Sequence, residues 1–110
     1  MERILPDPDA ALPLPYRERR YTAQDGLSLY YREYGDPLGP GVPLLCLPGL
    51  ARNAKDFHRL AMRLKDRHWI VCPDYRGRGR SAYDPNSENY QPATYLNDIR
   101  HLLAAAGMHR

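Results

Sequence analysis

The sequence has few cysteines and no long apolar run, and both shortages exclude classes of protein. Its 110 residues include two cysteines, Cys46 and Cys72, without the spacing of a metal site or a disulfide framework. We therefore expect two reduced thiols inside a core and no bound metal. No apolar stretch approaches the roughly 20 residues needed to cross a bilayer. The first nine residues, MERILPDPD, carry acids and prolines where a secretion signal has an apolar segment, which predicts a cytoplasmic protein.

A strong excess of one charge is also missing. Sixteen Lys and Arg stand against thirteen Asp and Glu, the net charge is +3, and the two signs are interspersed. A basic patch of the kind that binds nucleic acid or an anionic membrane is not indicated, so we expect neither partner. Apolar residues make up 43% and charged residues 26%, as in ordinary globular proteins, and the length permits one domain at most.

The N-terminal third predicts a lead-in followed by a β-hairpin. Residues 1–16 hold four prolines and should be irregular, so that the domain itself comprises residues 17–110. Strands are expected over residues 17–22 and 27–34, joined by the turn dipeptide Asp25-Gly26. Alternation in the second strand predicts one half-buried face. That face comprises Leu27, Leu29, Tyr31 and Glu33.

The middle of the chain predicts a strand–helix–strand unit. Residues 42–47 and 69–72 are short apolar runs bounded by Pro or Gly, which is typical of parallel strands buried on both faces. A helix should begin at Asn53, which can cap it together with Asp56. Its expected apolar stripe comprises Phe57, Leu60, Ala61 and Leu64.

A second helix should begin at Pro92 and end before Gly107. Its expected buried stripe comprises Leu96, Ile99, Leu103 and Ala106. The element order is then a hairpin followed by β-α-β-α. A further strand should follow the last helix, so the α/β sheet is expected to be incomplete on its own.

Two segments carry a resemblance to a known family. LLCLPGL (residues 44–50) is an apolar strand that ends in a glycine turn, and DYRGRGRS (residues 74–81) follows the next buried strand. With the intervening and following helices in the expected order, the sequence resembles the N-terminal portion of the α/β-hydrolase superfamily. It looks closest to the esterases, enol-lactonases and C–C hydrolases. The resemblance implies a doubly wound α/β sheet, a small-molecule substrate and no cofactor.

The resemblance also implies one site residue, Leu50. In this family the backbone N–H after the turn forms half of the oxyanion hole, and such a donor needs no particular side chain. Pro48 stands where the family usually has histidine, which affects the loop geometry more than the chemistry. The alternative is a glycine turn without a catalytic role. In the second segment, Asp74 and Arg76 are expected to hold the strand exit.

The arginine-rich loop invites a different interpretation. GRGRSA (residues 77–82) satisfies the G-x-G-x-x-A pattern of dinucleotide-binding proteins. That pattern needs a helix to start in the loop and face the pyrophosphate, whereas Tyr83-Asp84-Pro85-Asn86 indicates a turn. We therefore expect no nicotinamide or other cofactor.

No catalytic set can be assembled from the serines and histidines present. None of the three serines, Ser28, Ser81 and Ser87, lies in G-x-S-x-G, and none of the four histidines is expected to act as a base. The family order implies that nucleophile, acid and histidine lie downstream of Arg110. The sequence thus predicts the oxyanion-hole segment of a serine-type hydrolase of esters, lactones or related compounds. It should be inactive unless the remainder of the domain, in the same or a second chain, completes it. The alternative is a truncated, non-catalytic fragment that acts through strand addition or partner binding.

Overall fold

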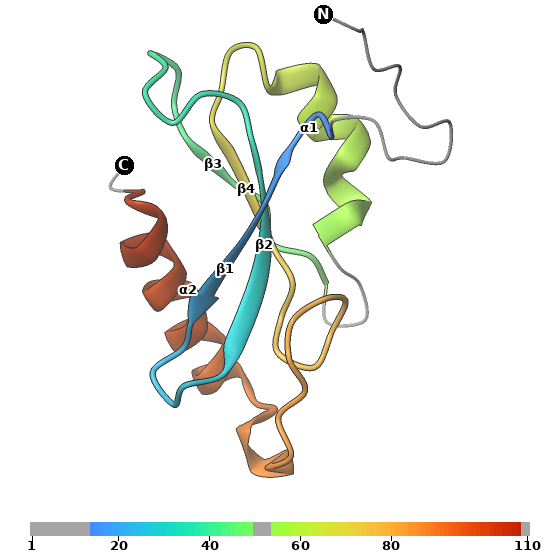
Figure 1. Ribbon diagram of the computed structural model, residues 1–110, viewed down its shortest axis with the longest axis vertical. Coiled ribbons are helices and arrows are strands. Elements are labelled where there is room, and N and C mark those ends of the chain that lie inside the picture. Colours follow the sequence, from blue (N-terminus) through green and yellow to red (C-terminus); the bar gives the residue numbers. More distant parts are fainter. Residues whose placement is uncertain (1–13, 50–53, 109–110) are drawn as a thin grey trace, which may run out of the picture.

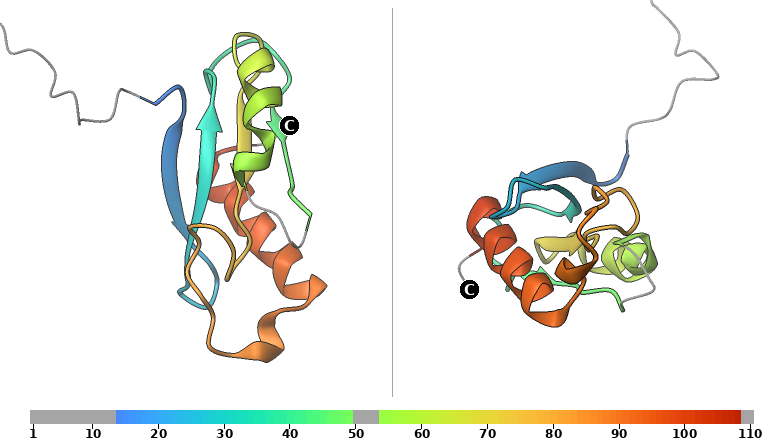
Figure 2. Two further views of the ribbon diagram at one scale, coloured as in Figure 1. Left: turned by 90° about the vertical axis from the view of Figure 1, so that its right-hand side faces the viewer. Right: turned by 90° about the horizontal axis from the view of Figure 1, so that it is seen from below.

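A twisted four-stranded sheet forms the centre of the computed structural model, which describes residues 14–49 and 54–108 (Figure 1). The strand order is β1-β2-β4-β3, with β3 and β4 parallel and the other neighbours antiparallel. The strands are β1 (Arg17–Thr22), β2 (Ser28–Tyr34), β3 (Leu44–Leu45) and β4 (Ile70–Pro73). Helices α1 (His58–Leu64) and α2 (Pro92–Ala106) cover opposite faces of this sheet (Figure 2). The expected hairpin followed by β-α-β-α is confirmed, as is the N-terminal part of an α/β-hydrolase sheet.

The hairpin forms where the sequence predicts it. β1 has the predicted bounds, and β2 begins one residue later than expected. In the turn, the amide of Gly26 donates to the Ala23 carbonyl and Gly26 adopts φ 89°, a conformation that glycine adopts without strain. The expected lead-in, residues 1–16, lies almost entirely outside the described residues.

The prediction that β2 is buried on one face is wrong. Leu29 and Tyr31 pack in the cluster that includes residues of α2, while Tyr30 and Tyr34 pack in the cluster under α1. β2 lies between β1 and β4 with a helix on each side of the sheet, and both of its faces are therefore covered.

The two parallel strands differ in burial. All four residues of β4 are buried, as the apolar run predicts. β3 is shorter than the predicted strand over residues 42–47 and only partly buried, with Val42 57% and Leu47 44% exposed. Leu45 packs against the cluster that includes residues of α2 and Leu44 against the cluster under α1, so both faces of β3 are covered as predicted. Its partial exposure comes from its edge, where the described residues place no second strand neighbour.

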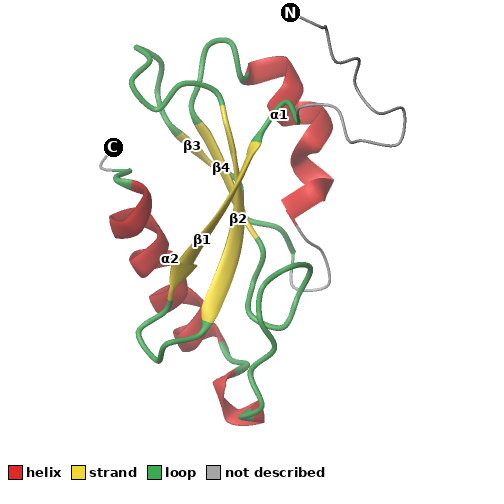
Figure 3. Cartoon of the chain, viewed as in Figure 1, coloured by secondary structure: helices red, strands yellow, loops and turns green. Residues whose placement is uncertain are grey.

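The first helical segment starts as a 3₁₀ turn, η1 (Ala54–Phe57), and continues as α1 (His58–Leu64). Figure 3 draws both in the colour of a helix. The predicted cap, Asn53, lies outside the described residues. Ala61 is buried, but Leu60 is 48% exposed, so the predicted stripe is wrong at that position. Met62 packs against the sheet cluster instead.

The second helical segment is α2 (Pro92–Ala106), preceded by the short 3₁₀ helix η2 (Ser87–Asn89). It begins at Pro92 and ends at Gly107 with φ 75°, both as predicted. Its buried face is rotated from the predicted stripe, since Leu96 is 64% exposed while Asp98 and Leu102 are buried. Asp98 faces inward because its carboxylate accepts a hydrogen bond from the buried guanidinium of Arg76. No helix in residues 14–49 and 54–108 combines the length and apolar character required to span a bilayer.

Candidate functional site

The exit of β3 leads into the segment expected to form the oxyanion hole. The Cys46 amide donates to the Val71 carbonyl at 2.9 Å, which extends the parallel pairing one residue beyond β3. Pro48 is buried and Gly49 is exposed. Leu50 lies outside the described residues, so its role as an oxyanion donor stays a prediction.

Asp74, at the end of β4, organises the neighbouring loops through hydrogen bonds. Its Oδ1 accepts from the amide of Ala54 and its Oδ2 accepts from the amide of Arg80 at 2.9 Å. Its carbonyl accepts from the Ser81 hydroxyl at 2.7 Å, and that hydroxyl in turn accepts from the amide of Tyr30 at 2.8 Å. One buried carboxylate therefore joins the chain after residue 53 to the loop after β4.

Gly79 is required for this arrangement. A Cβ atom at this position would collide with the carboxylate of Asp74, and the backbone adopts φ 50°. Both conditions favour glycine, one through space and the other through conformation. No helix starts in this loop, since α2 begins only at Pro92, so the loop does not form the helix N-terminus on which dinucleotide binding depends.

Arg76 is the second fixed point of the loop and one of the most buried residues, at 2% exposure. Its guanidinium forms ion pairs with three carboxylates from different elements. They are Asp25 of the hairpin turn at 2.7 Å, Asp84 of the following loop at 2.7 Å and Asp98 of α2 at 2.6 Å. Asp74 and Arg76 thus hold the strand exit in the way the resemblance implies.

The three carboxylates were not identified from the sequence. Asp25, Asp84 and Asp98 are far apart along the chain, and only Asp98 carried a signal, as an acid in the apolar face of a helix. The Arg76 guanidinium lowers the pKa of Asp25. The pKa of Asp84 is lowered first by the amide of Asn86 and further by Asn89 and Arg76. Carboxylates held ionised in this way are ion-pair partners and poor general bases.

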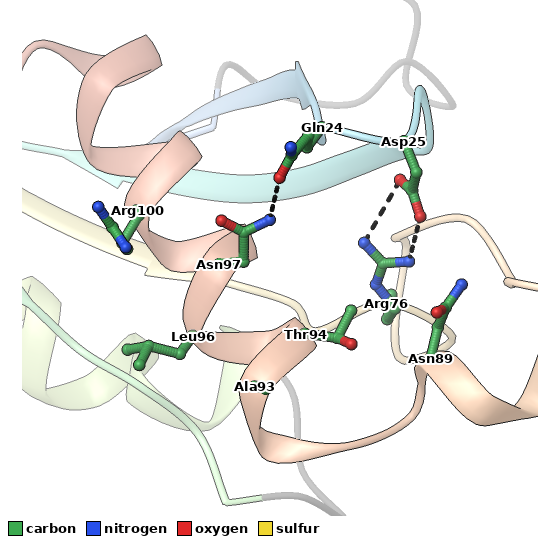
Figure 4. A pocket seen from close by; sticks show the side chains of 9 residues that line it. All are labelled: Gln24, Asp25, Arg76, Asn89, Ala93, Thr94, Leu96, Asn97 and Arg100. Carbon is green, nitrogen blue, oxygen red and sulfur yellow. Dashed lines mark hydrogen bonds and ion pairs between the residues drawn. The ribbon is translucent and has the colours of Figure 1, made fainter.

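Beside this cluster lies an open pocket of about 700 Å³ between the hairpin turn and α2 (Figure 4). It is lined by Gln24, Asp25, Arg76, Asn89, Ala93, Thr94, Leu96, Asn97 and Arg100. The side-chain amide of Asn97 in α2 donates to the side-chain oxygen of Gln24 beside the hairpin turn at 2.6 Å (Figure 4). The lining is mixed: the Asp25 carboxylate is paired with Arg76, and no histidine lines the pocket to activate the hydroxyl of Thr94 as a nucleophile.

Two of the three serines and two of the three described histidines have structural partners for their side chains. Ser81 is committed to the backbone, and the Ser28 hydroxyl accepts from Arg20 at 3.2 Å. The ring of His58 pairs with the Tyr34 hydroxyl at 2.8 Å, and that of His68 with the Val42 carbonyl at 2.7 Å. Within the described residues no serine–histidine pair forms. The prediction that this part of the chain lacks a complete catalytic set is therefore not contradicted.

Both cysteines are free thiols, Cys72 buried and Cys46 half-buried. The parallel register pairs Leu45 of β3 with Val71 of β4, and Cys46 and Cys72 are the next residues along the two segments. Both cysteines belong to the cluster under α1. A hydrogen bond from Cys72 lowers the pKa of Cys46 to about 7, while the same contact and burial raise the pKa of Cys72.

Comparisons with known proteins give the fold and the sequence relatives. No family model matches the sequence. The chain is 40% identical over 74 residues to a 3-hydroxybutyrate-oligomer hydrolase of Cupriavidus necator, covering 67% of this chain and 25% of that protein. It is 34% identical over 70 residues to a human serine hydrolase-like protein, covering 64% of this chain and 34% of that protein.

A solved structure matches over more of the chain. The crystal structure of an α/β hydrolase from Novosphingobium aromaticivorans superposes with a TM-score of 0.80 at 47% identity, covering 87% of this chain and 33% of that one. The chain therefore spans between a quarter and about a third of the length of these relatives. The sheet order, the loop after β4 and these matches agree, and the chain belongs to the α/β-hydrolase superfamily.

Proposed function

We propose that this chain supplies the oxyanion-hole segment of a serine-type hydrolase that cleaves an ester, a lactone or a related small molecule. The amide of Leu50 donates to the oxyanion that develops on the substrate carbonyl. The nucleophile, on a strand-to-helix elbow, and its acid and histidine partners come from polypeptide outside these 110 residues.

The observation that carries this proposal is the hydrogen bond from the Ala54 amide to the Asp74 carboxylate. It anchors the far end of the segment that contains Leu50 to the exit of β4, and buried Pro48 anchors the near end. An oxyanion donor is effective when its position is fixed before the reaction begins. The described residues on either side of this segment thus lie at the exits of two parallel strands, which supports the proposal.

The edge of β3 supports the same function. β3 pairs with β4 on one side, and within the described residues no strand lies on its other side. A further parallel strand there would bring its carboxyl end next to the segment after Pro48. In α/β sheets, ligands bind at such strand ends where the strand order reverses.

The experiment replaces Leu50, whose N–H is the proposed donor, in the complete natural protein that contains this chain. Leu50→Pro removes the N–H, and the loss of one oxyanion donor costs about 3–4 kcal/mol, or about 100- to 1000-fold in kcat. Leu50→Ala keeps the N–H and is the matched control, with kcat expected within about three-fold of the parent protein on a p-nitrophenyl ester. Undiminished turnover in Leu50→Pro would refute the assignment.

A non-catalytic fragment is the second candidate, and the exposed apolar residues beside β3, Val42 and Leu47, favour it. An unpaired strand edge with apolar flanks accepts strands from other chains. Labelling with a fluorophosphonate probe separates the candidates. The hydrolase proposal predicts a labelled serine in the complete protein and none in residues 1–110 alone, whereas a fragment that acts by strand addition gives no labelled serine with any natural partner.

A further inference from the structure

Cys46 and Cys72 lie side by side on the two parallel segments of the sheet, although they are far apart in the sequence. β3 and β4 pair Leu45 with Val71, and the amide of Cys46 donates to the Val71 carbonyl at 2.9 Å, so the pairing continues to the two cysteines. Both thiols are free, and both side chains pack in the cluster under α1. The two sulfur atoms are therefore neighbours on one face of the sheet.

This placement meets the distance requirement of a disulfide. Neighbouring strands lie about 4.7–4.9 Å apart, and disulfides usually join Cα atoms that are about 4.4–6.8 Å apart. The two thiols already interact, since the Cys72 thiol donates a hydrogen bond to the Cys46 sulfur. Rotation of the two side chains can thus bring the sulfur atoms together, and neither strand has to be displaced.

The two thiols differ in exposure and in acidity. Cys46 is half-buried, whereas Cys72 is buried within β4. The hydrogen bond from Cys72 lowers the pKa of Cys46 to about 7, while the same contact and burial raise the pKa of Cys72. The thiolate is the form that oxidants modify, and accessible thiolates are modified first. Cys46 is therefore the thiol that reacts first, and Cys72 is a protonated thiol placed beside it.

The surroundings of the pair leave few other reaction partners for an oxidised Cys46. The cluster under α1 otherwise consists of aliphatic and aromatic side chains and a methionine. Among residues 14–49 and 54–108, no group of three His, Cys, Asp or Glu side chains is placed to hold a metal ion. Within this part of the chain the neighbouring thiol is the group with which an oxidised Cys46 can form a covalent bond.

We propose that Cys46 and Cys72 form a redox-active pair, which a peroxide converts into an intramolecular disulfide. The Cys46 thiolate attacks one oxygen of hydrogen peroxide, the O–O bond breaks, and Cys46 becomes a sulfenic acid while hydroxide leaves. The Cys72 sulfur then attacks the Cys46 sulfur, the S–S bond forms as the S–O bond breaks, and the Cys72 proton leaves with the hydroxyl group as water. The two sulfurs lose two electrons in total, and the peroxide gains them. A dithiol reductant reverses the change by thiol–disulfide exchange.

The disulfide links the two strand exits at which the neighbouring loops begin. Cys46 lies two residues before Pro48, and Cys72 lies two residues before Asp74. In the oxidised protein a covalent bond therefore restrains the separation of the exit of β3 from that of β4, and reduction removes this restraint. The pair goes beyond the proposed function, because neither step involves Leu50 or a substrate.

The test exposes the complete natural protein to hydrogen peroxide, blocks the remaining thiols with N-ethylmaleimide and maps the cysteines by mass spectrometry without reduction. We expect two peptides joined through Cys46 and Cys72, with a mass lower by two hydrogen atoms than the sum of the reduced peptides. Modification of Cys46 by iodoacetamide should stop after peroxide treatment and return after reduction with dithiothreitol.

Two variants establish the order of the steps. Cys72→Ser removes the second sulfur and keeps a hydroxyl donor beside Cys46, so the sulfenic acid should persist and its adduct with dimedone should increase several-fold over the parent protein. Cys46→Ser is the matched control and should give no dimedone adduct at Cys72, because that thiol is buried and its pKa is raised.

Three results overturn the proposal. One is a peroxide-treated parent protein without the linked peptides, and this result does not depend on how a variant folds. Another is an equal dimedone adduct at Cys46 in the parent protein and in Cys72→Ser, since Cys72 would then take no part. The third is a dimedone adduct at Cys72 in Cys46→Ser as large as that at Cys46 in Cys72→Ser, since the two thiols would then not differ. The hydrolase proposal is tested separately by the Leu50 variants.

Discussion

Arg76 and Asp98 form a two-point ion pair inside the protein, with Nε to Oδ2 at 2.7 Å and Nη2 to Oδ1 at 2.6 Å. Both side chains are almost fully buried, so the pair is shielded from water. It joins the loop after β4 to α2, and Asp25 and Asp84 complete the shell around the same guanidinium. Beside the apolar packing of α2, one charged residue in a loop thus contributes to holding this helix on the sheet.

Arg76→Lys should therefore destabilise the protein strongly. The ammonium group of lysine lacks the planar set of donors with which the guanidinium holds the three carboxylates, and a buried acceptor left without its donor costs about 1–3 kcal/mol, or more when it is charged. The free energy of unfolding in urea measures this loss. Arg59→Lys, at an exposed position in α1, is the control and should stay within about 0.5 kcal/mol of the parent protein. Equal urea midpoints for the two variants would contradict a structural role for Arg76.

Acid should weaken the fold partly through Glu33 of β2. Burial alone would raise the pKa of Glu33, but hydrogen bonds from Arg17 at 2.8 Å, Trp69 at 2.9 Å and Arg19 at 3.2 Å outweigh it and lower the pKa. Because the folded-state pKa lies below the unfolded value, the unfolded chain binds more protons. This contribution to stability is complete above the ordinary pKa of a glutamate and is lost as the pH falls through the lowered value.

Glu33→Gln tests that pH dependence. The variant should be less stable than the parent protein at pH 7, and the difference should shrink as the pH falls from 5 toward 3. Thermal unfolding followed across this range measures it. Asp66→Asn is the matched control, since Asp66 is 87% exposed and contacts Lys65 only at 3.6 Å. A difference between Glu33→Gln and the parent that stays constant with pH would show that the lowered pKa contributes nothing.

Much of the fold follows from local signals in the sequence. The Asp25-Gly26 turn, the start of α2 at Pro92 and its end at Gly107 depend on the conformational preferences of single residues, and all three form as predicted. β4 is buried throughout because its apolar run has no interruption. Such features depend on a few neighbouring residues and can be inferred without knowing what packs against them.

Burial of individual faces could not be inferred in the same way. Leu60 and Leu96 continue apolar patterns and yet are exposed, while Asp98 is buried in the face where an apolar residue would be expected. Asp98 is buried because it pairs with Arg76, which lies 22 positions away in the sequence. The candidate site depended even more on resemblance, since a backbone N–H such as that of Leu50 leaves no side-chain signal.

Cys46 should react with alkylating reagents near neutral pH. The hydrogen bond from Cys72 stabilises the Cys46 thiolate and lowers its pKa to about 7, whereas burial and the same contact raise the pKa of Cys72. Thiolates are the reactive form, so the rate of iodoacetamide modification at Cys46 should be half-maximal below the pH at which an ordinary cysteine thiol titrates. Peptide mapping by mass spectrometry should find Cys72 unmodified.

Cys72→Ala checks the cause of that reactivity. Removing the donor should move the half-maximal pH of Cys46 upward, toward the ordinary value for a cysteine thiol. Cys46→Ser provides the complementary control and should leave Cys72 unreactive over the same range. An unchanged pH profile in Cys72→Ala would mean that another group sets the pKa of Cys46.

Gly79 and Gly26 allow two reasons for a glycine to be separated, a positive φ and a lack of space for a Cβ atom. Both adopt positive φ, 50° and 89°, but a Cβ at Gly79 collides with the Asp74 carboxylate, while a Cβ at Gly26 meets nothing within 4 Å. Gly26→Ala should therefore cost about 1–2 kcal/mol of stability through backbone strain alone. Gly79→Ala adds the collision, typically about 1–3 kcal/mol, and displaces the carboxylate that holds Ala54 and Arg80. Urea unfolding measures the stability of both variants.

The proposed function predicts a further difference, in activity, between these two variants. Gly79→Ala should lower the esterase activity of the complete protein, whereas Gly26→Ala, when folded, should not. If both variants lose the same stability and the same activity, Asp74 has no special role in fixing the loop that contains Leu50.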